Sequence, residues 1–137
     1  MGVNEGPYRT KIIEKNSTQY CRYSPLEIIN HNCTVFGSSL AGRAETVTQI
    51  LNSRTRLPIP IYLKCGIFMF PTTSMRNHDC MWISYYQVLG YRKHCNRTLI
   101  FLKGNTNIFV NISLQQFDTQ IKRTSQVIAY FHGLICL

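Results

Sequence analysis

Apolar residues recur at helical spacing in only two segments of this chain. In the first segment, intervals of four, three and four residues separate Leu40, Ala44, Val47 and Leu51. Ser38 or Ser39 can cap the start of this segment, because a serine hydroxyl accepts a hydrogen bond from a free backbone N–H group of the first turn. We therefore expect a helix at about residues 38–53.

The second helical segment lies near the end of the sequence. Its apolar stripe consists of Leu114, Phe117, Ile121, Thr124 and Ile128. Ser113 and Gln116 stand just before it at the spacing of a capping box. We expect a helix at about residues 113–131, with Lys122 and Arg123 on or beside the face opposite the stripe.

Turn-forming residues divide the rest of the sequence into short extended runs. Pro58 and Pro60 keep their neighbours extended, because proline disfavours helix in the residue before it. Gly104-Asn105 is typical of a two-residue hairpin turn. We expect strands at 8–15, 19–23, 67–70, 80–89, 98–103 and 106–112, and a further extended segment at 26–36. The pattern predicts one α+β domain over residues 1–137, mainly an antiparallel β-sheet with the two helices.

The chain is strongly basic. Fifteen Lys and Arg residues against six Asp and Glu residues give a formal net charge of +9. The imbalance is local, since residues 46–117 contain eight basic residues and a single acid, Asp79. Charge of this sign and density attracts polyanions, because each neutralised phosphate releases condensed counterions. Charge alone does not distinguish DNA from RNA or from an anionic membrane, and a basic surface that serves only solubility is the simpler alternative.

Six cysteines and four Asn-x-Ser/Thr sequons would also fit a secreted, disulfide-linked protein. However, the sequence begins without the charged and apolar segments of a signal peptide. Its longest apolar stretch, 59–70, is interrupted by Pro60, Lys64 and Gly66 and is far shorter than a membrane span. We expect a cytoplasmic protein without membrane contact, in which all six cysteines are reduced.

Motifs for catalysis or metal binding are weak. The serines at 37–42 do not form a Gly-x-Ser-x-Gly elbow, and the six carboxylates are scattered. His31 and Cys33 with His78 and Cys80 could supply four zinc ligands, but their spacing matches no zinc signature. We therefore expect no enzymatic activity, no bound metal and no cofactor.

Four short motifs occur in a characteristic order. They are KIIEK at 11–15, FGSSLAGR at 36–43, FMFPT at 68–72 and CMWIS at 80–84. In this order they resemble the ComK family, the competence transcription factors of Gram-positive bacteria. The resemblance extends from about Lys11 to the second predicted helix, and the eight-residue glycine-serine motif is its most specific part.

The resemblance implies a DNA-binding activator of genes for DNA uptake. Family members bind double-stranded DNA at AT-rich boxes through the minor groove, as dimers that assemble further, and they bend the DNA. We accordingly expect a homodimer or higher oligomer. We also expect this chain to lack the family's longer N- and C-terminal extensions, including the tail that an adaptor of a Clp-type protease recognises. The alternative function is that of a truncated paralogue that pairs with or modulates the full-length factor without activating transcription.

Charge and resemblance together predict the residues that contact DNA. Arginine suits phosphate contact and the narrow minor groove of AT-rich sequences, where the negative potential is strongest. Arg43 opens the first predicted helix, and Arg92 and Lys93 fall in the predicted loop before the hairpin. The predicted contacts are Ser38, Ser39, Arg43, Arg54, Arg56, Arg92, Lys93, Lys122 and Arg123.

Overall fold

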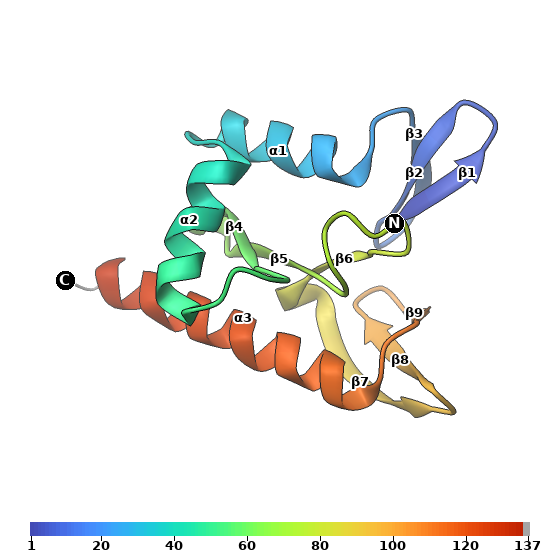
Figure 1. Cartoon of the computed structure of the whole chain (residues 1–137). Coiled ribbons are helices and arrows are strands. Elements are labelled where there is room, and N and C mark those ends of the chain that lie inside the picture. Colours follow the sequence, from blue (N-terminus) through green and yellow to red (C-terminus); the bar gives the residue numbers. More distant parts are fainter. Residues whose placement is uncertain (136–137) are drawn as a thin grey trace.

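The computed structural model describes residues 1–135 of the chain as three helices and three small antiparallel sheets (Figure 1). The helices are α1 (Pro25–Val35), α2 (Leu40–Leu51) and α3 (Leu114–Ile135). The first sheet contains β1 (Gly2–Glu5), β2 (Tyr8–Ile13) and β3 (Thr18–Cys21). The second contains β4 (Ile59–Tyr62), β5 (Ile67–Pro71) and β6 (Trp82–Ser84), and the third β7 (Val88–His94), β8 (Arg97–Leu102) and β9 (Thr106–Val110). The predicted α+β class and antiparallel pairing are confirmed.

Helix α1 corrects the prediction of an extended segment at 26–36. Ser24 caps the helix, because its hydroxyl accepts a hydrogen bond from the Glu27 N–H group at 3.2 Å while the Glu27 carboxylate accepts from the Ser24 N–H group at 3.1 Å. Pro25 occupies the first helical position, where its missing N–H group costs nothing. The sequence Ser-Pro-Leu-Glu is therefore a helix start, whereas we interpreted its proline as a break.

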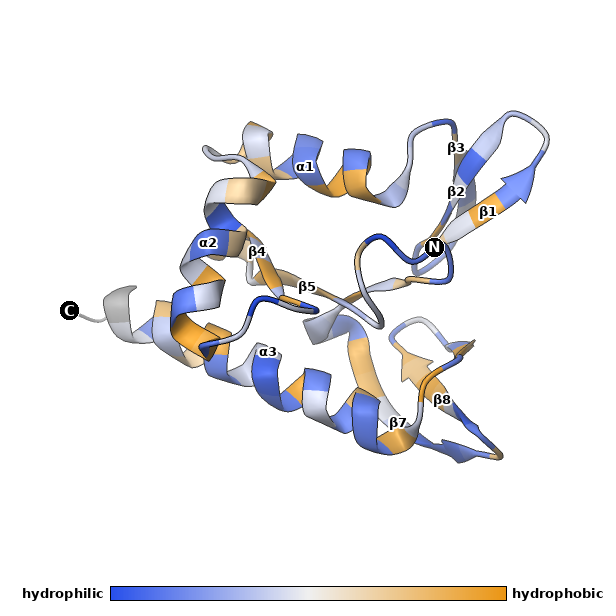
Figure 2. Ribbon diagram, in the orientation of Figure 1, coloured by the Kyte–Doolittle hydropathy of each residue, from blue (hydrophilic) through white to orange (hydrophobic). Residues whose placement is uncertain are grey.

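The two predicted helices are confirmed with shifted bounds. Ser39 caps α2 by accepting a hydrogen bond from the Gly42 N–H group at 3.1 Å. The capping box of α3 is present, since Ser113 and Gln116 exchange backbone-to-side-chain hydrogen bonds of 3.1 Å in both directions. Helix α3 runs four residues beyond the predicted end at 131. Figure 2 shows hydrophilic and hydrophobic residues alternating along α3, as expected for a helix with one buried face.

The region after β5 differs most from the prediction. The predicted strand 80–89 is two strands, β6 and β7, separated by the short 3₁₀-helix η2 (Tyr85–Gln87). Strand β7 continues past Gly90 to His94, so Arg92 and Lys93 lie on a strand and not in a loop. The hairpin between β8 and β9 has three loop residues, with Gly104 at φ +83° and Asn105 at φ +59°. An added Cβ at Gly104 would also lie only 2.8 Å from the Lys15 carbonyl oxygen.

Two hydrophobic clusters form the core. In the first, Val47 of α2, Ile59 of β4 and Phe68 of β5 meet Val127 and Ile128 of α3. The second lies between α3 and the third sheet and contains Phe70, Ile83, Ile100, Val110, Ile112 and Phe117. Figure 1 shows α3 extending from the end of α2 to the third sheet, and residues of α3 belong to both clusters.

The sequence also predicts that the apolar segment 127–137 packs over the sheet or against a second copy. Within the described residues, Val127 and Ile128 are buried in the first core cluster, and the centre of the Phe131 ring lies 6.5 Å from that of Phe68. Cys136 and Leu137 lie outside the described residues. Of the described helices, none combines the length and apolar composition needed to cross a bilayer.

Candidate nucleic-acid interface

The predicted contact residues lie in separate regions of the fold. Ser38, Ser39 and Arg43 are at the start of α2, while Arg54 and Arg56 follow its end. A helix rises about 1.5 Å per residue, so the 12 residues of α2 hold these two groups about 18 Å apart. Lys122 and Arg123 lie on α3, and Arg92 and Lys93 lie on β7.

Arg43 is turned toward the protein. A guanidinium has five N–H donors, and those of Arg43 meet five acceptors. They are the Ser38 hydroxyl at 3.0 Å and the carbonyl oxygens of Cys33 at 3.0 Å, Phe36 at 3.1 Å, Ile61 at 2.8 Å and Pro60. These acceptors come from the end of α1, the loop before α2 and strand β4, so the side chain joins three elements.

Ser38 and Ser39 serve the same junction. The Ser38 hydroxyl accepts from the Arg43 Nε–H group, and the Ser39 hydroxyl caps α2. The N–H group of Leu40 donates to the Asn30 side chain of α1 at 3.0 Å. The hydroxyls and the guanidinium are therefore engaged within the protein and do not form a group of free phosphate-binding donors.

Arg123 holds the loop that carries Arg54 and Arg56. Its guanidinium donates to the carbonyl oxygens of Thr55 at 2.7 Å and Arg56 at 3.1 Å, and to the Gln120 side-chain oxygen at 2.6 Å. Burial lowers the pKa of Arg123, and the nearby charge of Arg56 lowers it further. Arg123 is a predicted DNA contact, but its side chain is partly buried and its guanidinium donates within the protein to position the loop.

The loop holds Arg56 in a strained conformation. Arg56 has φ +50°, a left-handed backbone that costs a residue other than glycine about 1 kcal/mol or more. Its carbonyl oxygen accepts from both Arg123 and the buried Gln120 side chain, the latter at 3.0 Å. The side chains of Arg54 and Arg56 remain exposed. Neither makes an ion pair with a described residue.

One helical turn before Lys122, at Asp118, α3 is joined to the third sheet. The Tyr91 hydroxyl of β7 donates to Asp118 of α3 at 2.6 Å, and the Lys122 ammonium contacts the same carboxylate at 2.7 Å. Burial, and then the hydrogen bond to Asp118, raises the pKa of Tyr91 to about 12. The hydrogen bonds from Lys122 and Tyr91 lower the pKa of Asp118. Lys93 is exposed and lies on the same face of β7 as Tyr91, because strand residues two apart share a face.

Helix α3 therefore connects four of the predicted residues, which we call the α3 basic surface: Arg54, Arg56, Lys93 and Lys122. Arg123 fixes the loop at one side of the helix, and Asp118 fixes β7 at the other. Only the charge of Lys122 is balanced locally by an acid. The hydrogen bond between Arg123 and Ser53 joins α3 to the loop after α2, two segments 70 residues apart in the sequence.

The outer face of the third sheet carries the predicted contact Arg92 together with basic and aromatic residues that the sequence did not predict as contacts. The antiparallel register places them in adjacent rows: His94 and Arg97, then Arg92, Leu99 and Phe109, then Phe101 and Asn107. The inner face packs Tyr91, Ile100 and Ile108 on the second core cluster. The sequence shows no alternation that marks this face, because 92–98 is almost entirely polar and 99–102 is apolar. The face becomes visible only through the register of β7, β8 and β9.

Other sites receive no support from the geometry. No three His, Cys, Asp or Glu side chains between residues 1 and 135 lie close enough together to hold a metal ion. Cys21, Cys33, Cys65, Cys80 and Cys95 are free thiols in this structure. Burial raises the pKa of the Cys33 thiol, which makes this buried cysteine a poor nucleophile. The reduced state of all six cysteines stays a prediction.

Comparison with known proteins identifies the family. The sequence profile described as "ComK protein" matches residues 3–133. The chain belongs to the ComK family. It is 32% identical over 133 residues to the competence transcription factor of Bacillus subtilis (strain 168), an alignment that covers 96% of this chain and 69% of that protein. No solved structure shows significant similarity.

The structure gives a physical role to the motif that first indicated the ComK family. The eight residues 36–43 span the junction between α1 and α2. Gly37 has φ +112°, which an L-residue with a side chain rarely adopts, and Arg43 ties the junction to β4. In this ComK-family chain the motif is therefore a structural junction, and its arginine is occupied before any ligand binds.

Proposed function

We propose that this protein is a cytoplasmic transcription regulator, not an enzyme, that binds AT-rich duplex DNA through the minor groove and activates genes for DNA uptake. Membership of the ComK family and the similarity to a competence transcription factor support the regulatory role. The observation that carries DNA binding is the uncompensated positive charge: one acid among residues 46–117, against eight basic residues. Clustered charge of this kind draws a polyanion and makes its binding salt-dependent.

Within the proposed DNA interface, the α3 basic surface is the part whose residues the hydrogen bonds of α3 hold most firmly in place. Its arginines project from a loop whose backbone is fixed by Arg123 and Gln120, so little backbone entropy is lost when they bind phosphate. Arginine also suits insertion into a narrow minor groove, which is a property of AT-rich DNA. We propose that the protein acts on paired sites as a homodimer or higher oligomer. Contact with an adaptor of a Clp-type protease remains an expectation from the resemblance.

The salt dependence of DNA binding tests the role of this surface. Replacing Arg54 and Arg56 together by alanine is expected to reduce the slope of log K against log salt by about two, because each lost phosphate contact removes about 0.9. The measurement is fluorescence anisotropy with an AT-rich duplex at several salt concentrations.

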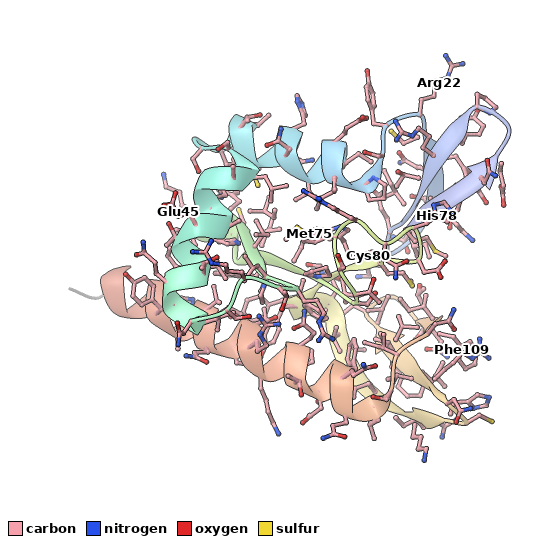
Figure 3. All side chains as sticks on the ribbon, in the orientation of Figure 1. Arg22, Glu45, Met75, His78, Cys80 and Phe109 are labelled. Carbon is pink, nitrogen blue, oxygen red and sulfur yellow. The ribbon has the colours of Figure 1, made fainter. Side chains whose placement is uncertain are left out.

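A charge-matched control accompanies this variant. Arg22→Ala with Lys64→Ala also removes two exposed positive charges, and Arg22 lies at the far side of the molecule from α3 (Figure 3). This control is expected to keep the wild-type slope to within a few tenths. An equal reduction in both double variants would show that net charge alone determines binding, and would remove the α3 basic surface from the proposed interface.

A further inference from the structure

The outer face of the third sheet is built from stacked arginine and phenylalanine side chains. The Arg97 guanidinium lies 4.4 Å from the centre of the Phe109 ring, and Arg92 lies 5.6 Å from that of Phe101. His94 adds a second ring 5.0 Å from Phe109. Such cation–π contacts hold a guanidinium flat on a ring while leaving its N–H donors in the ring plane.

These side chains cover the sheet without using their polar groups. Leu99 stands at the centre of the face and is only 8% exposed, although it belongs to neither core cluster. The register places Arg92 and Phe109 on either side of it, with Arg97 and Phe101 in the adjacent rows of the same face. Arg92 and Arg97 themselves are exposed, and neither guanidinium donates a hydrogen bond to a described residue. The face therefore presents pre-positioned arginines whose donors are unused.

Phe109 remains exposed on this face, with 43% of its surface in solvent. It lies on the edge strand β9, and Figure 3 shows it at the side of the molecule away from the helices. An isolated exposed apolar residue is ordinary, but this one is flanked by Arg97 and His94. An aromatic ring between cations fits a ligand that offers an apolar ring face beside negative charges.

We propose that this outer face is a direct contact surface for duplex DNA, with Arg92 and Arg97 on the phosphates and Phe109 against a base step. The proposal rests on the proposed function and names a second part of its interface. Charge complementarity selects the partner: residues 80–117 contain four basic residues and no acid. Proteins that bind the minor groove frequently press an apolar side chain between base pairs, and strands can carry such a residue.

The test measures binding of the full chain to an AT-rich duplex that carries 2-aminopurine at single positions. Replacing Arg92 and Arg97 together by alanine is expected to reduce the salt slope by about two. Phe109→Ala is expected to weaken binding about tenfold with the slope unchanged, because base stacking carries no counterion release. The wild-type protein is expected to increase the 2-aminopurine fluorescence, which reports an opened base step. Phe109→Ala is expected to abolish this increase.

Two matched variants distinguish a specific contact by this face from the effect of losing any positive charge or any exposed aromatic ring. Arg97→Lys keeps the charge but loses the flat stacking on Phe109, so it should keep the slope and weaken binding several-fold. Tyr23→Ala removes another exposed aromatic ring, at 65% exposure, and should bind as wild type does. Circular dichroism melts confirm that each variant remains folded at the assay temperature.

Each other outcome overturns the proposal in a distinguishable way. If the outer-face variants bind as wild type does while the Arg54 and Arg56 double variant loses slope, the function stands and this face is not a contact. If they change sedimentation of the protein alone and leave DNA affinity intact, the face joins copies of the chain. Preference for single-stranded over duplex DNA through the same residues contradicts the duplex mode, and absence of any DNA binding by wild type overturns the proposal and the function together.

Discussion

Replacing Arg43 by alanine is expected to lower the free energy of unfolding by about 3 kcal/mol or more. The guanidinium donates to five acceptors on the α1 end, the intervening loop and β4. Its removal leaves carbonyl oxygens without donors at the junction of three elements, and an unsatisfied buried polar group costs about 1–3 kcal/mol. Urea denaturation followed by circular dichroism measures the change.

Two variants make this prediction specific. Arg54→Ala removes an exposed arginine without such bonds and should change the stability by less than about 0.5 kcal/mol. Arg43→Lys should not restore the lost stability, because an ammonium is a point charge and cannot reach five separated acceptors. If Arg43→Ala instead keeps wild-type stability and loses DNA affinity, Arg43 contacts DNA as the sequence alone predicted.

Replacing Gln120 by leucine is expected to cost about 2–4 kcal/mol of folding stability. Gln120 is only 2% exposed, and its amide group donates to the carbonyl oxygens of Pro71 at 2.7 Å and Arg56 at 3.0 Å. Its oxygen accepts from Arg123. Leucine has a similar volume but no polar atoms, so both carbonyl groups and the guanidinium lose a partner at once.

The same variant should release the loop that carries Arg54 and Arg56. DNA affinity is therefore expected to fall more in Gln120→Leu than in Gln126→Leu, a control on the exposed surface of α3. Chemical denaturation and the anisotropy assay are measured on both proteins. Equal stability of the two variants would show that the buried network does not hold the loop.

The sequence predicted elements well where a local signal determines structure. The capping box at Ser113 and the apolar stripe after it identified α3, and the serines at 38–39 identified the start of α2. The same kind of signal at Ser24 was present but was outweighed by Pro25, which we interpreted only as a breaker. Proline at the first helical position removes a donor that has no partner in any case, so it is compatible with a helix start.

The functional assignments were harder to predict, because charge is visible in a sequence and side-chain direction is not. Arg43 and Arg54 have the same formal charge, yet one donates to five acceptors and the other lies in solvent. The difference depends on carbonyl groups that the fold brings from 7 to 18 residues away. The arginine–phenylalanine stacks likewise depend on the register of β7, β8 and β9, which a misplaced strand end concealed.

We propose above all that the folded protein binds AT-rich duplex DNA electrostatically and with sequence preference. The most direct test is an electrophoretic shift of the wild-type chain with an AT-box duplex and a GC-rich control of equal length, at two salt concentrations. We predict tighter binding to the AT-rich probe at both concentrations and a steep loss of affinity for both probes as salt rises. Absence of binding to the AT-rich duplex at low salt would contradict the account and favour a chain that modulates a full-length factor without contacting DNA.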